Sequence, residues 1–285
     1  MKKILLIAVL LLPTMLRAQW TDEYGTWLEL GAKKNLGTRW SIGLEAEYRA
    51  QENSRWALGV DAGYKLNKYI KFGAGYTLLY NRKGEKRVDK NSGDPTIDDN
   101  YVRGYNLTPA YAYPRHRFIA EATVDKRFWK WLRISLRERY QLTYCPAKNH
   151  EKYKHREEFI KVYEFDEDWN PIESWFALDP VDKTETECDP ATTAQILRSR
   201  LKFEVDKKGW KFSPFISAEA HNSVRCGDHM AIDKVRTAIG TGYKINKNHE
   251  VSLAYILTYV FKDNEEKNKP NNRIHAVSIG YNFKF

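Results

Sequence analysis

Hydrophobic and polar residues alternate with a period of two along most of the chain. In residues 40–51 the even-numbered positions are apolar or aromatic, as at Trp40, and the odd-numbered positions are small or polar, as at Glu45. Successive side chains of a strand point to opposite sides, so this alternation predicts a strand with one apolar and one polar face. The same alternation recurs in ten other segments, and we predict an all-β fold. The eleven predicted strands are residues 25–36, 40–51, 56–66, 70–80, 115–128, 131–144, 195–206, 210–222, 235–245, 249–261 and 273–285.

The predicted strands are long for a soluble protein. They cover about 11 to 14 residues each, whereas strands of globular proteins mostly cover ~5–6 residues and a tilted transmembrane strand needs ~9–11. The apolar face of residues 249–261, which carries Leu253 and Leu257, would be unusual in contact with water. Strand length and the quality of this face favour a transmembrane, antiparallel, up-and-down β-barrel over a soluble sandwich.

The connections between the predicted strands alternate in length. Tight turns such as Asn67-Lys68 join the strands of each hairpin, and longer polar segments join one hairpin to the next. Short periplasmic turns and long extracellular loops are the rule in outer-membrane barrels, which normally have an even number of strands. We therefore expect twelve strands, the twelfth lying before residue 25 or inside a long loop, with ten strands as the alternative. The long loops are expected at about residues 81–114 and 145–194, with shorter ones at 223–234 and 262–272.

The first residues have the order of a secretory signal peptide. A basic start that includes Lys2 precedes an apolar run at residues 4–12, and Ala18 supplies the small residue of a cleavage site. We expect residues 1–18 to be removed and residues 19–285 to form a single barrel domain in the bacterial outer membrane. The rest of the chain has no other long apolar run, which excludes transmembrane helices because each needs about 20 mostly apolar residues.

The formal net charge of +10 narrows the expected partners. A strongly basic chain can indicate nucleic-acid binding, but the export signal argues against a nucleic-acid partner. An exported basic barrel is expected to meet the anionic lipid of the outer membrane, or to carry anions through its lumen. Aromatic residues make up 14% of the chain, with 18 Tyr and 9 Trp, which fits the aromatic girdles of a membrane barrel.

Seven sequence blocks, in this order, resemble a known family. They are WLEL at 27–30, LEAEYR at 44–49, PRHRF at 114–118, SLRERYQLTY at 135–144, LRSRL at 197–201, YKINK at 243–247 and IGYNFKF at 279–285. They resemble the family called domain of unknown function 2490, which is presumed to consist of outer-membrane barrels. The resemblance covers nearly the whole chain after the signal peptide, and it implies a location and a fold but no activity, cofactor or functional residue. The insert between Cys145 and Cys188 is larger and more acidic than the family pattern.

The last predicted strand ends in an aromatic residue. Its apolar face runs from Val277 to Phe285, the final residue of the chain. A terminal aromatic on an amphipathic strand resembles the label that the barrel-assembly machinery recognises. That machinery is therefore an expected partner through Phe285, besides the lipid of the outer membrane, and no cofactor is expected.

The polar faces of the predicted strands carry many charged residues that would point into the lumen. An unpaired charge inside a barrel is costly, so opposite charges are expected to lie across neighbouring strands. One interpretation is a structural ladder of Arg–Glu pairs that fills a narrow barrel. The other is a passage whose excess of arginine attracts anions, because rings of Arg or Lys bias pores toward anions. The predicted ladder consists of Glu45, Glu47, Arg49, Arg117, Glu121, Asp125, Arg133, Arg137, Arg139, Arg198, Arg200, Lys202, Glu204 and Glu219.

A lipid-modifying enzyme is the alternative function, because some outer-membrane barrels hydrolyse or transfer lipid chains with a Ser and a His. The candidate pairs are His221 with Ser217 and His275 with Ser278. Four residues of a strand cover roughly 13 Å at ~3.3 Å per residue, which places Ser217 beyond hydrogen-bond reach of His221. His275 and Ser278 fall on opposite faces, and no Gly-x-Ser-x-Gly motif is present. No catalytic residue is therefore assigned, and a barrel that binds a surface partner is a further alternative.

Three cysteines, Cys145, Cys188 and Cys226, fall in the predicted outer loops, where disulfides can form. A bridge between Cys145 and Cys188 would pin the two ends of the long insert, but three cysteines leave the pairing open. The cysteine spacing matches no zinc template, and no metal site is expected. The acidic insert is expected to be a solvated loop, although its aromatic residues favour some order, as in a lid or a contact with a surface partner.

Overall fold

The computed structural model describes residues 20–51, 54–94, 96, 98, 100–224, 231–261 and 271–285, and their regular structure is entirely β. The predicted signal peptide, residues 1–18, lies outside the described residues. In the described ranges no helix is long and apolar enough to cross a membrane. The chain divides into a barrel unit and a second unit, which comprises Tyr80–Arg115 and Cys145–Thr192.

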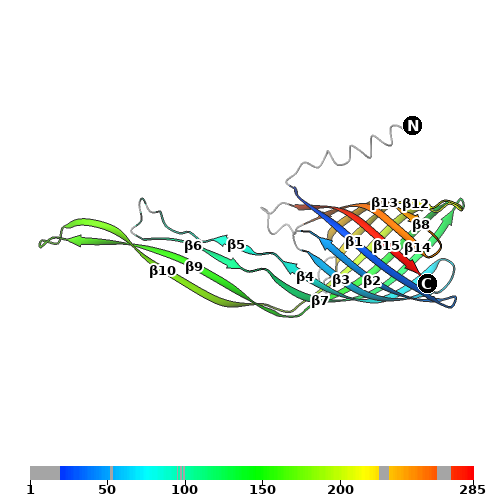
Figure 1. Ribbon diagram of the computed structural model, residues 1–285, viewed down its shortest axis with the longest axis horizontal. Helices are drawn as coiled ribbons and strands as arrows, with labels where there is room; N and C mark the ends of the chain where they lie inside the picture. Colours follow the sequence, from blue (N-terminus) through cyan, green and yellow to red (C-terminus); the bar gives the residue numbers. More distant parts are fainter. Residues whose placement is uncertain are drawn as a thin grey trace, which may run out of the picture. The chain divides into compact units, whose positions relative to one another are not determined.

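Eleven strands of the described residues close into a barrel (Figure 1). Around the ring the order is β1-β15-β14-β13-β12-β11-β8-β7-β4-β3-β2, and β2 pairs with β1 to close it. Each barrel strand contains most of one predicted segment, so the alternation located all eleven. The barrel strands are β1 (Trp20–Leu36), β2 (Trp40–Ala50), β3 (Arg55–Lys65), β4 (Ile70–Lys83), β7 (Tyr111–Phe128), β8 (Leu132–Cys145), β11 (Thr192–Val205), β12 (Phe212–Ser223), β13 (Ala231–Lys244), β14 (His249–Val260) and β15 (Asn271–Lys284).

The expectation of twelve strands is wrong, and so is the alternative of ten. Across the described residues the barrel has eleven strands, and its first and last strands, β1 and β15, run parallel. In an up-and-down barrel with an odd number of strands, the first and last strands point the same way, so closure requires one parallel pair. The residues ahead of the predicted first strand add no new strand, because they lengthen β1, which begins at Trp20 opposite Asn271. The barrel is therefore mixed rather than purely antiparallel.

Tight turns gather at one end of the barrel, which we call the tight-turn rim. The turns after β1, β3, β7, β11 and β13 lie there, and β15 ends there, whereas β1 begins at the opposite rim. Between β7 and β8, Trp129 and Lys130 have φ values of 44° and 59°. Two consecutive residues with positive φ form a type I′ turn, whose twist matches that of the flanking strands.

The long connections that were predicted as loops form strands instead. β5 (Lys86–Asp89) and β6 (Asn100–Thr108) occupy the first connection, and β9 (Lys148–Phe165) and β10 (Pro171–Asp189) occupy the second. Together they make a four-stranded sheet in the order β10-β9-β6-β5. The rings of Tyr101 and Phe159 stack on one face of this sheet with centroids 4.5 Å apart. The expectation that the acidic insert is a loop is therefore wrong, because β9 and β10 are strands, and aromatic cross-strand pairs stabilise their sheet.

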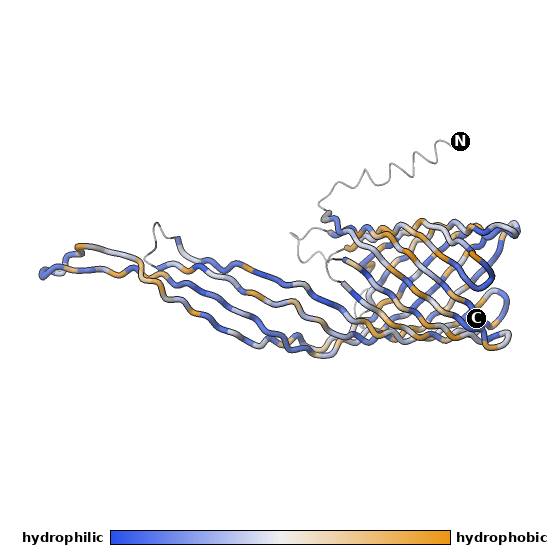
Figure 2. Tube along the Cα trace, viewed as in Figure 1, coloured by the Kyte–Doolittle hydropathy of each residue, from blue (hydrophilic) through white to orange (hydrophobic). Residues whose placement is uncertain are grey.

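The barrel carries apolar side chains outside and polar side chains inside. Figure 2 shows hydrophobic and hydrophilic residues alternating along its strands. On the outer face Leu30, Leu44 and Leu58 are 59%, 61% and 62% exposed, whereas Gln141 and Glu219 inside are each 4% exposed. This distribution is the reverse of a soluble protein, in which large apolar side chains are buried.

Small residues and one apolar cluster shape the interior. Gly43 lies beside Asp61, and a Cβ atom at this glycine would collide with the Asp61 carboxylate. Trp27, Ile256 and Ala276 form a compact buried cluster against the inner wall. The interior is therefore mostly polar, and glycines such as Gly43 make room for the charged side chains beside them.

Candidate functional site in the barrel lumen

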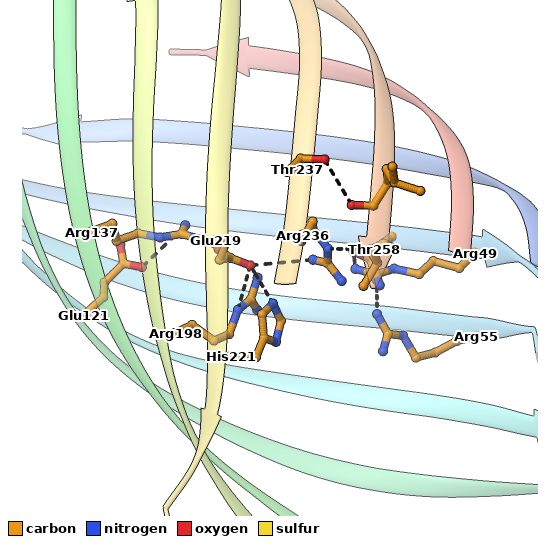
Figure 3. A network of polar contacts seen from close by, with 12 residues as sticks. Arg49, Arg55, Glu121, Arg137, Arg198, Glu219, His221, Arg236, Thr237 and Thr258 are labelled. Atoms are coloured by element: carbon orange, nitrogen blue, oxygen red, sulfur yellow. Dashed lines mark hydrogen bonds and ion pairs between the residues drawn. The ribbon is translucent and has the colours of Figure 1, made fainter. Parts of the chain in front are cut away.

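Glu219 on β12 is the centre of a dense ion-pair cluster in the lumen (Figure 3). Its carboxylate accepts a hydrogen bond from Nη2 of Arg137 at 2.9 Å and two hydrogen bonds from Arg198. Nη1 of Arg236 lies 3.8 Å from the same carboxylate, and Nε2 of His221 lies 2.9 Å from it. Four neighbouring strands deliver these groups, because the polar faces of β8, β11, β12 and β13 all point inward. One buried carboxylate thus compensates three guanidinium groups.

Two carboxylates on β7 form further pairs with the neighbouring strands. Glu121 lies directly opposite Arg139 in the strand register, and Nη2 of Arg139 is 2.6 Å from its carboxylate. Asp125 accepts hydrogen bonds from Nζ of Lys71 at 2.8 Å and from Nη2 of Arg133 at 2.9 Å. Both pairs follow the rule that charges inside a barrel are met across adjacent strands.

Other members of the predicted ladder pair within a strand or across a single turn. Glu47 on β2 accepts hydrogen bonds from Nη2 of Arg49 at 2.7 Å and from Nη2 of Arg55 at 2.6 Å. On β11, Lys202 donates to the carboxylate of Glu204, two residues further along the same strand. The structure therefore brings most of the predicted charges into local pairs.

Three residues of the predicted ladder, Arg200, Arg117 and Glu45, differ from this pattern. Arg200 on β11 has no ion pair or side-chain hydrogen bond with any described residue, and its Nε atom is buried without a partner. Within the part of the chain that the structure describes, Arg117 has only the hydroxyl of Thr143 at 3.4 Å as a side-chain hydrogen-bond acceptor. Glu45 on β2 likewise has no cationic partner within the described ranges, although it lines the same space as Arg200.

Bulky buried side chains lie in the half of the lumen away from the tight-turn rim. The ring of Trp27 is 3% exposed and lies between two guanidinium groups, 3.6 Å from that of Arg49 and 4.9 Å from that of Arg236. Leu79 and Thr258, in the corresponding halves of their strands, are 0% and 1% exposed. Trp27, Leu79 and the Glu219 cluster line one end of a cavity in the lumen.

Two adjoining cavities occupy the rest of the lumen. Their volumes are about 590 Å³ and about 710 Å³, and Arg137 and Arg200 line both of them. The larger cavity reaches the tight-turn rim, where Arg39 and Lys65 contribute to its wall. Its lining includes ten Lys and Arg residues against five Asp and Glu residues. The space nearest the tight-turn rim is therefore strongly cationic.

A comparison with models of protein families identifies the family of the chain. A model of the family described as "Protein of unknown function (DUF2490)" matches residues 24–269. The chain belongs to this family. The DUF2490 match confirms the resemblance seen in the sequence blocks, and it spans the barrel strands from β2 to β14 together with the second sheet. No curated protein matches the chain. Membership of DUF2490 therefore establishes the family of the chain but assigns no activity to it.

Neither predicted Ser–His pair is formed in this DUF2490 barrel. His221 binds the carboxylate at the centre of the lumen cluster and has no hydrogen bond to Ser217 among the described residues. His275 lies on the outer face, where its Nδ1 is 2.6 Å from the hydroxyl of Tyr255. Ser278 points inward and is buried. Among the described residues, neither candidate serine is therefore hydrogen-bonded to its candidate histidine.

The cysteines of the second unit are free thiols in the structure. Cys188 on β10 lies opposite Asn149, four residues further along the chain than Cys145, so the two cysteines are out of register. The predicted bridge between Cys145 and Cys188 is not formed, and Cys226 lies outside the described residues. No group of His, Cys, Asp and Glu in the described part of the chain could hold a metal ion.

The second unit contains its own polar pairs. Nδ1 of His155 on β9 lies 2.6 Å from the carboxylate of Asp182, directly opposite on β10. This hydrogen bond raises the pKa of His155 above its ordinary value. Asp189 accepts a hydrogen bond from the hydroxyl of Tyr111 at 2.5 Å, which holds the pKa of Asp189 below its ordinary value.

Some lumen residues escaped the sequence-based ladder. Arg236 occupies the inward face of a predicted strand, next to glycines and alanine, so the alternation itself would have indicated it. Arg55 precedes the predicted strand 56–66 and joins β3 only in the structure. Trp27 was not assigned to either face from the sequence, and in the structure it lies inside the barrel with Glu29.

Proposed function

We infer that the chain is an outer-membrane β-barrel whose lumen admits small anions from the tight-turn rim. The observation that carries this proposal is the lining of the larger cavity, in which ten cationic side chains face five acidic ones. A concave space lined mainly by one sign of charge concentrates ions of the opposite sign. Rings of Arg and Lys accordingly bias pores toward anions.

The outer face of the barrel supports its placement in a membrane. Ile239, Leu253 and Ile279 lie on adjacent strands and are 59%, 53% and 45% exposed. Soluble proteins rarely expose apolar surface that is continuous over many strands. A membrane barrel needs such a band, because its outer side chains contact lipid.

Aromatic pairs near both rims add to this support. Trp40 and Tyr64 lie at the tight-turn rim with ring centroids 4.8 Å apart, and Tyr48 and Trp56 lie toward the opposite rim with centroids 4.3 Å apart. Outer-membrane barrels carry girdles of aromatic residues at both interfaces, and their short turns face the periplasm. The tight-turn rim would therefore open to the periplasm, where Phe285, 67% exposed, is available to the barrel-assembly machinery.

The bulky side chains in the half of the lumen away from the tight-turn rim favour a narrow passage. Trp27, held between Arg49 and Arg236, is the largest side chain at that level. Removing its indole enlarges the lumen without removing any of the charges that attract anions. This residue is therefore the point at which conductance can be tested.

Planar-bilayer recordings test the proposal. The Trp27→Ala variant is expected to conduct more than the unsubstituted protein, with a reversal potential in a KCl gradient that reports chloride preference. Trp129→Ala is the matched control, because Trp129 is 73% exposed at the tight-turn rim and does not line either cavity. Absence of current in all three proteins, or a preference for potassium, would refute the anion passage.

Exposed apolar residues at the turn between β9 and β10 favour a second candidate function, the binding of a surface partner. Trp169, Ile172 and Trp175 are 81%, 66% and 49% exposed. Exposed apolar clusters of this kind mark interaction sites. If the barrel shows no conductance, binding of a surface partner through this hairpin replaces the anion passage as the proposed function.

A further inference from the structure

We propose that the lumen holds a binding site for a small zwitterion, a molecule with a carboxylate at one end and an ammonium group at the other. The observation is a pair of oppositely charged walls that do not neutralise each other. Arg200 lacks a carboxylate partner among the described residues, and Glu45 lacks a cationic one, yet both line both cavities.

The topology explains why these two charges do not meet. Arg200 lies on β11 and Glu45 on β2, which are five strands apart in one direction around the ring and six in the other. No two strands of an eleven-stranded ring can be further apart. The two side chains therefore face each other across the full width of the lumen, whereas the ion pairs found among the described barrel strands join residues of one strand or strands at most two positions apart, as β8 and β12 are for Arg137 and Glu219.

Each wall is reinforced by further groups of the same sign. Glu29 on β1 also faces the smaller cavity, and its only side-chain hydrogen bond in the described chain comes from the hydroxyl of Ser278 at 3.3 Å. β1 is as far from β11 as β2 is. On the other wall Arg137 and Arg139 of β8 stand beside β11 and line both cavities, and each also pairs with a carboxylate, Glu219 and Glu121 respectively.

Two opposed walls discriminate between ligands by their charge distribution. A simple anion is attracted by the wall of Arg200 and repelled by that of Glu45, so part of the attraction is cancelled. A zwitterion that lies across the lumen is attracted at both ends, and a guanidinium can hold its carboxylate through two parallel hydrogen bonds. Glu29 and Glu45 are exposed to the cavity, so an ammonium group can reach them.

This site deepens the proposed function without depending on ion flow. The cationic excess near the tight-turn rim draws the carboxylate end inward, and the acidic wall of Glu29 and Glu45 then receives the ammonium end. The ligand class is therefore that of ω-amino acids and short peptides, whose two charges are separated by a flexible or extended backbone.

Isothermal titration calorimetry on the folded protein in detergent tests the site. The probes are 6-aminohexanoate, hexanoate and hexylammonium, with glycine and 4-aminobutyrate as shorter zwitterions. We expect 6-aminohexanoate to bind at least about tenfold more tightly than either singly charged probe. Arg200→Gln and Glu45→Gln are each expected to weaken its binding about tenfold.

Control variants and the opposite outcomes complete the test. Asp22→Asn and Arg273→Gln remove an ion pair of the same barrel that lines neither cavity, and binding by these variants is expected to be unchanged. Equal affinity for hexanoate and 6-aminohexanoate, no binding of any probe, or no effect of Glu45→Gln would overturn the proposal. Calorimetry in detergent needs no current, so failure of this site and failure of the anion passage are distinguishable.

Discussion

Removing the charge of Glu219 is expected to destabilise the barrel strongly. In Glu219→Gln the amide keeps the shape of the side chain, but three guanidinium groups lose their compensating charge. The side chains of Arg137, Arg198 and Arg236 are only 11%, 12% and 18% exposed, so water screens them little. Because breaking a buried ion pair costs about 3–5 kcal/mol, and the amide still accepts some hydrogen bonds, we expect a loss of about 3 kcal/mol.

The assay is equilibrium unfolding by guanidinium in lipid vesicles, followed by tryptophan fluorescence. Glu250→Gln is the matched control, because Glu250 pairs with the half-exposed Lys284 at 3.1 Å and such pairs contribute about 0–1 kcal/mol. Adding Arg198→Gln to Glu219→Gln removes one of the uncompensated cations and should recover part of the stability. A free energy of unfolding for Glu219→Gln within about 0.5 kcal/mol of the unsubstituted protein, or further destabilisation by Arg198→Gln, would refute the reasoning.

Three other predictions concern the remaining parts of the molecule. The hydrogen bond to Asp182 raises the pKa of His155, which NMR titration would show. The stability that this pair contributes is therefore fully present below the unfolded pKa of ~6.5. It is lost as the pH rises through the folded pKa. Glu138 lies on the outer face, and Glu138→Leu is expected to raise the free energy of unfolding in lipid by about 1–2 kcal/mol. Cysteines introduced by Leu28→Cys and Ile279→Cys are expected to form a disulfide on oxidation, because these residues are register partners across the parallel seam.

Each of these predictions has a control on the same element. Asp182→Asn should return the pKa of His155 toward ~6.5, and an unchanged titration curve would contradict the assignment. Ser199→Ala removes the hydroxyl that donates to Glu138 at 2.6 Å and should destabilise, whereas a loss of stability in Glu138→Leu would place that position outside lipid. Replacing Ser278 instead of Ile279 directs the second thiol inward, and cross-linking of Leu28→Cys with Ser278→Cys would disprove the seam.

The barrel strands were predictable because their two faces meet opposite environments. In β2, Leu44 faces outward and Glu45 inward, and every second residue repeats this choice. A shift of one residue would turn the whole face around, so the register is strongly specified by the pattern. The same alternation located all eleven strands, and the expectation of twelve came instead from the rule that bacterial barrels have an even number of strands. Trp20 to Tyr24 lengthen β1 through pairing with β15 and add no strand.

The strands of the second sheet were missed because both of their faces are mixed. In β9, Tyr153 and Phe159 share one face with His155 and Glu157, and Ile160 shares the other with Lys152 and Arg156. An alternation of apolar and polar residues is therefore absent even though the segment is extended. Aromatic and charged cross-strand pairs stabilise this sheet, and such pairs become visible only once the partner strand is known.

The lumen shows the same limit at the level of the candidate site. Parity alone indicated that Glu45 and Arg200 both point inward, and the cost of unpaired charge then predicted that each would find a partner on a neighbouring strand. Arg200 does lie opposite Glu219 in the register of β11 and β12, but Glu219 pairs with other arginines, Arg137, Arg198 and Arg236. The order of strands places Glu45 on the far side of the ring, because β2 and β11 are as far apart as an eleven-stranded barrel allows. With one strand more or fewer, other side chains would face Arg200 across the lumen. The charge pattern of the cavity therefore depends on how the ring closes, and the odd number of strands that requires the parallel seam also determines which walls oppose each other.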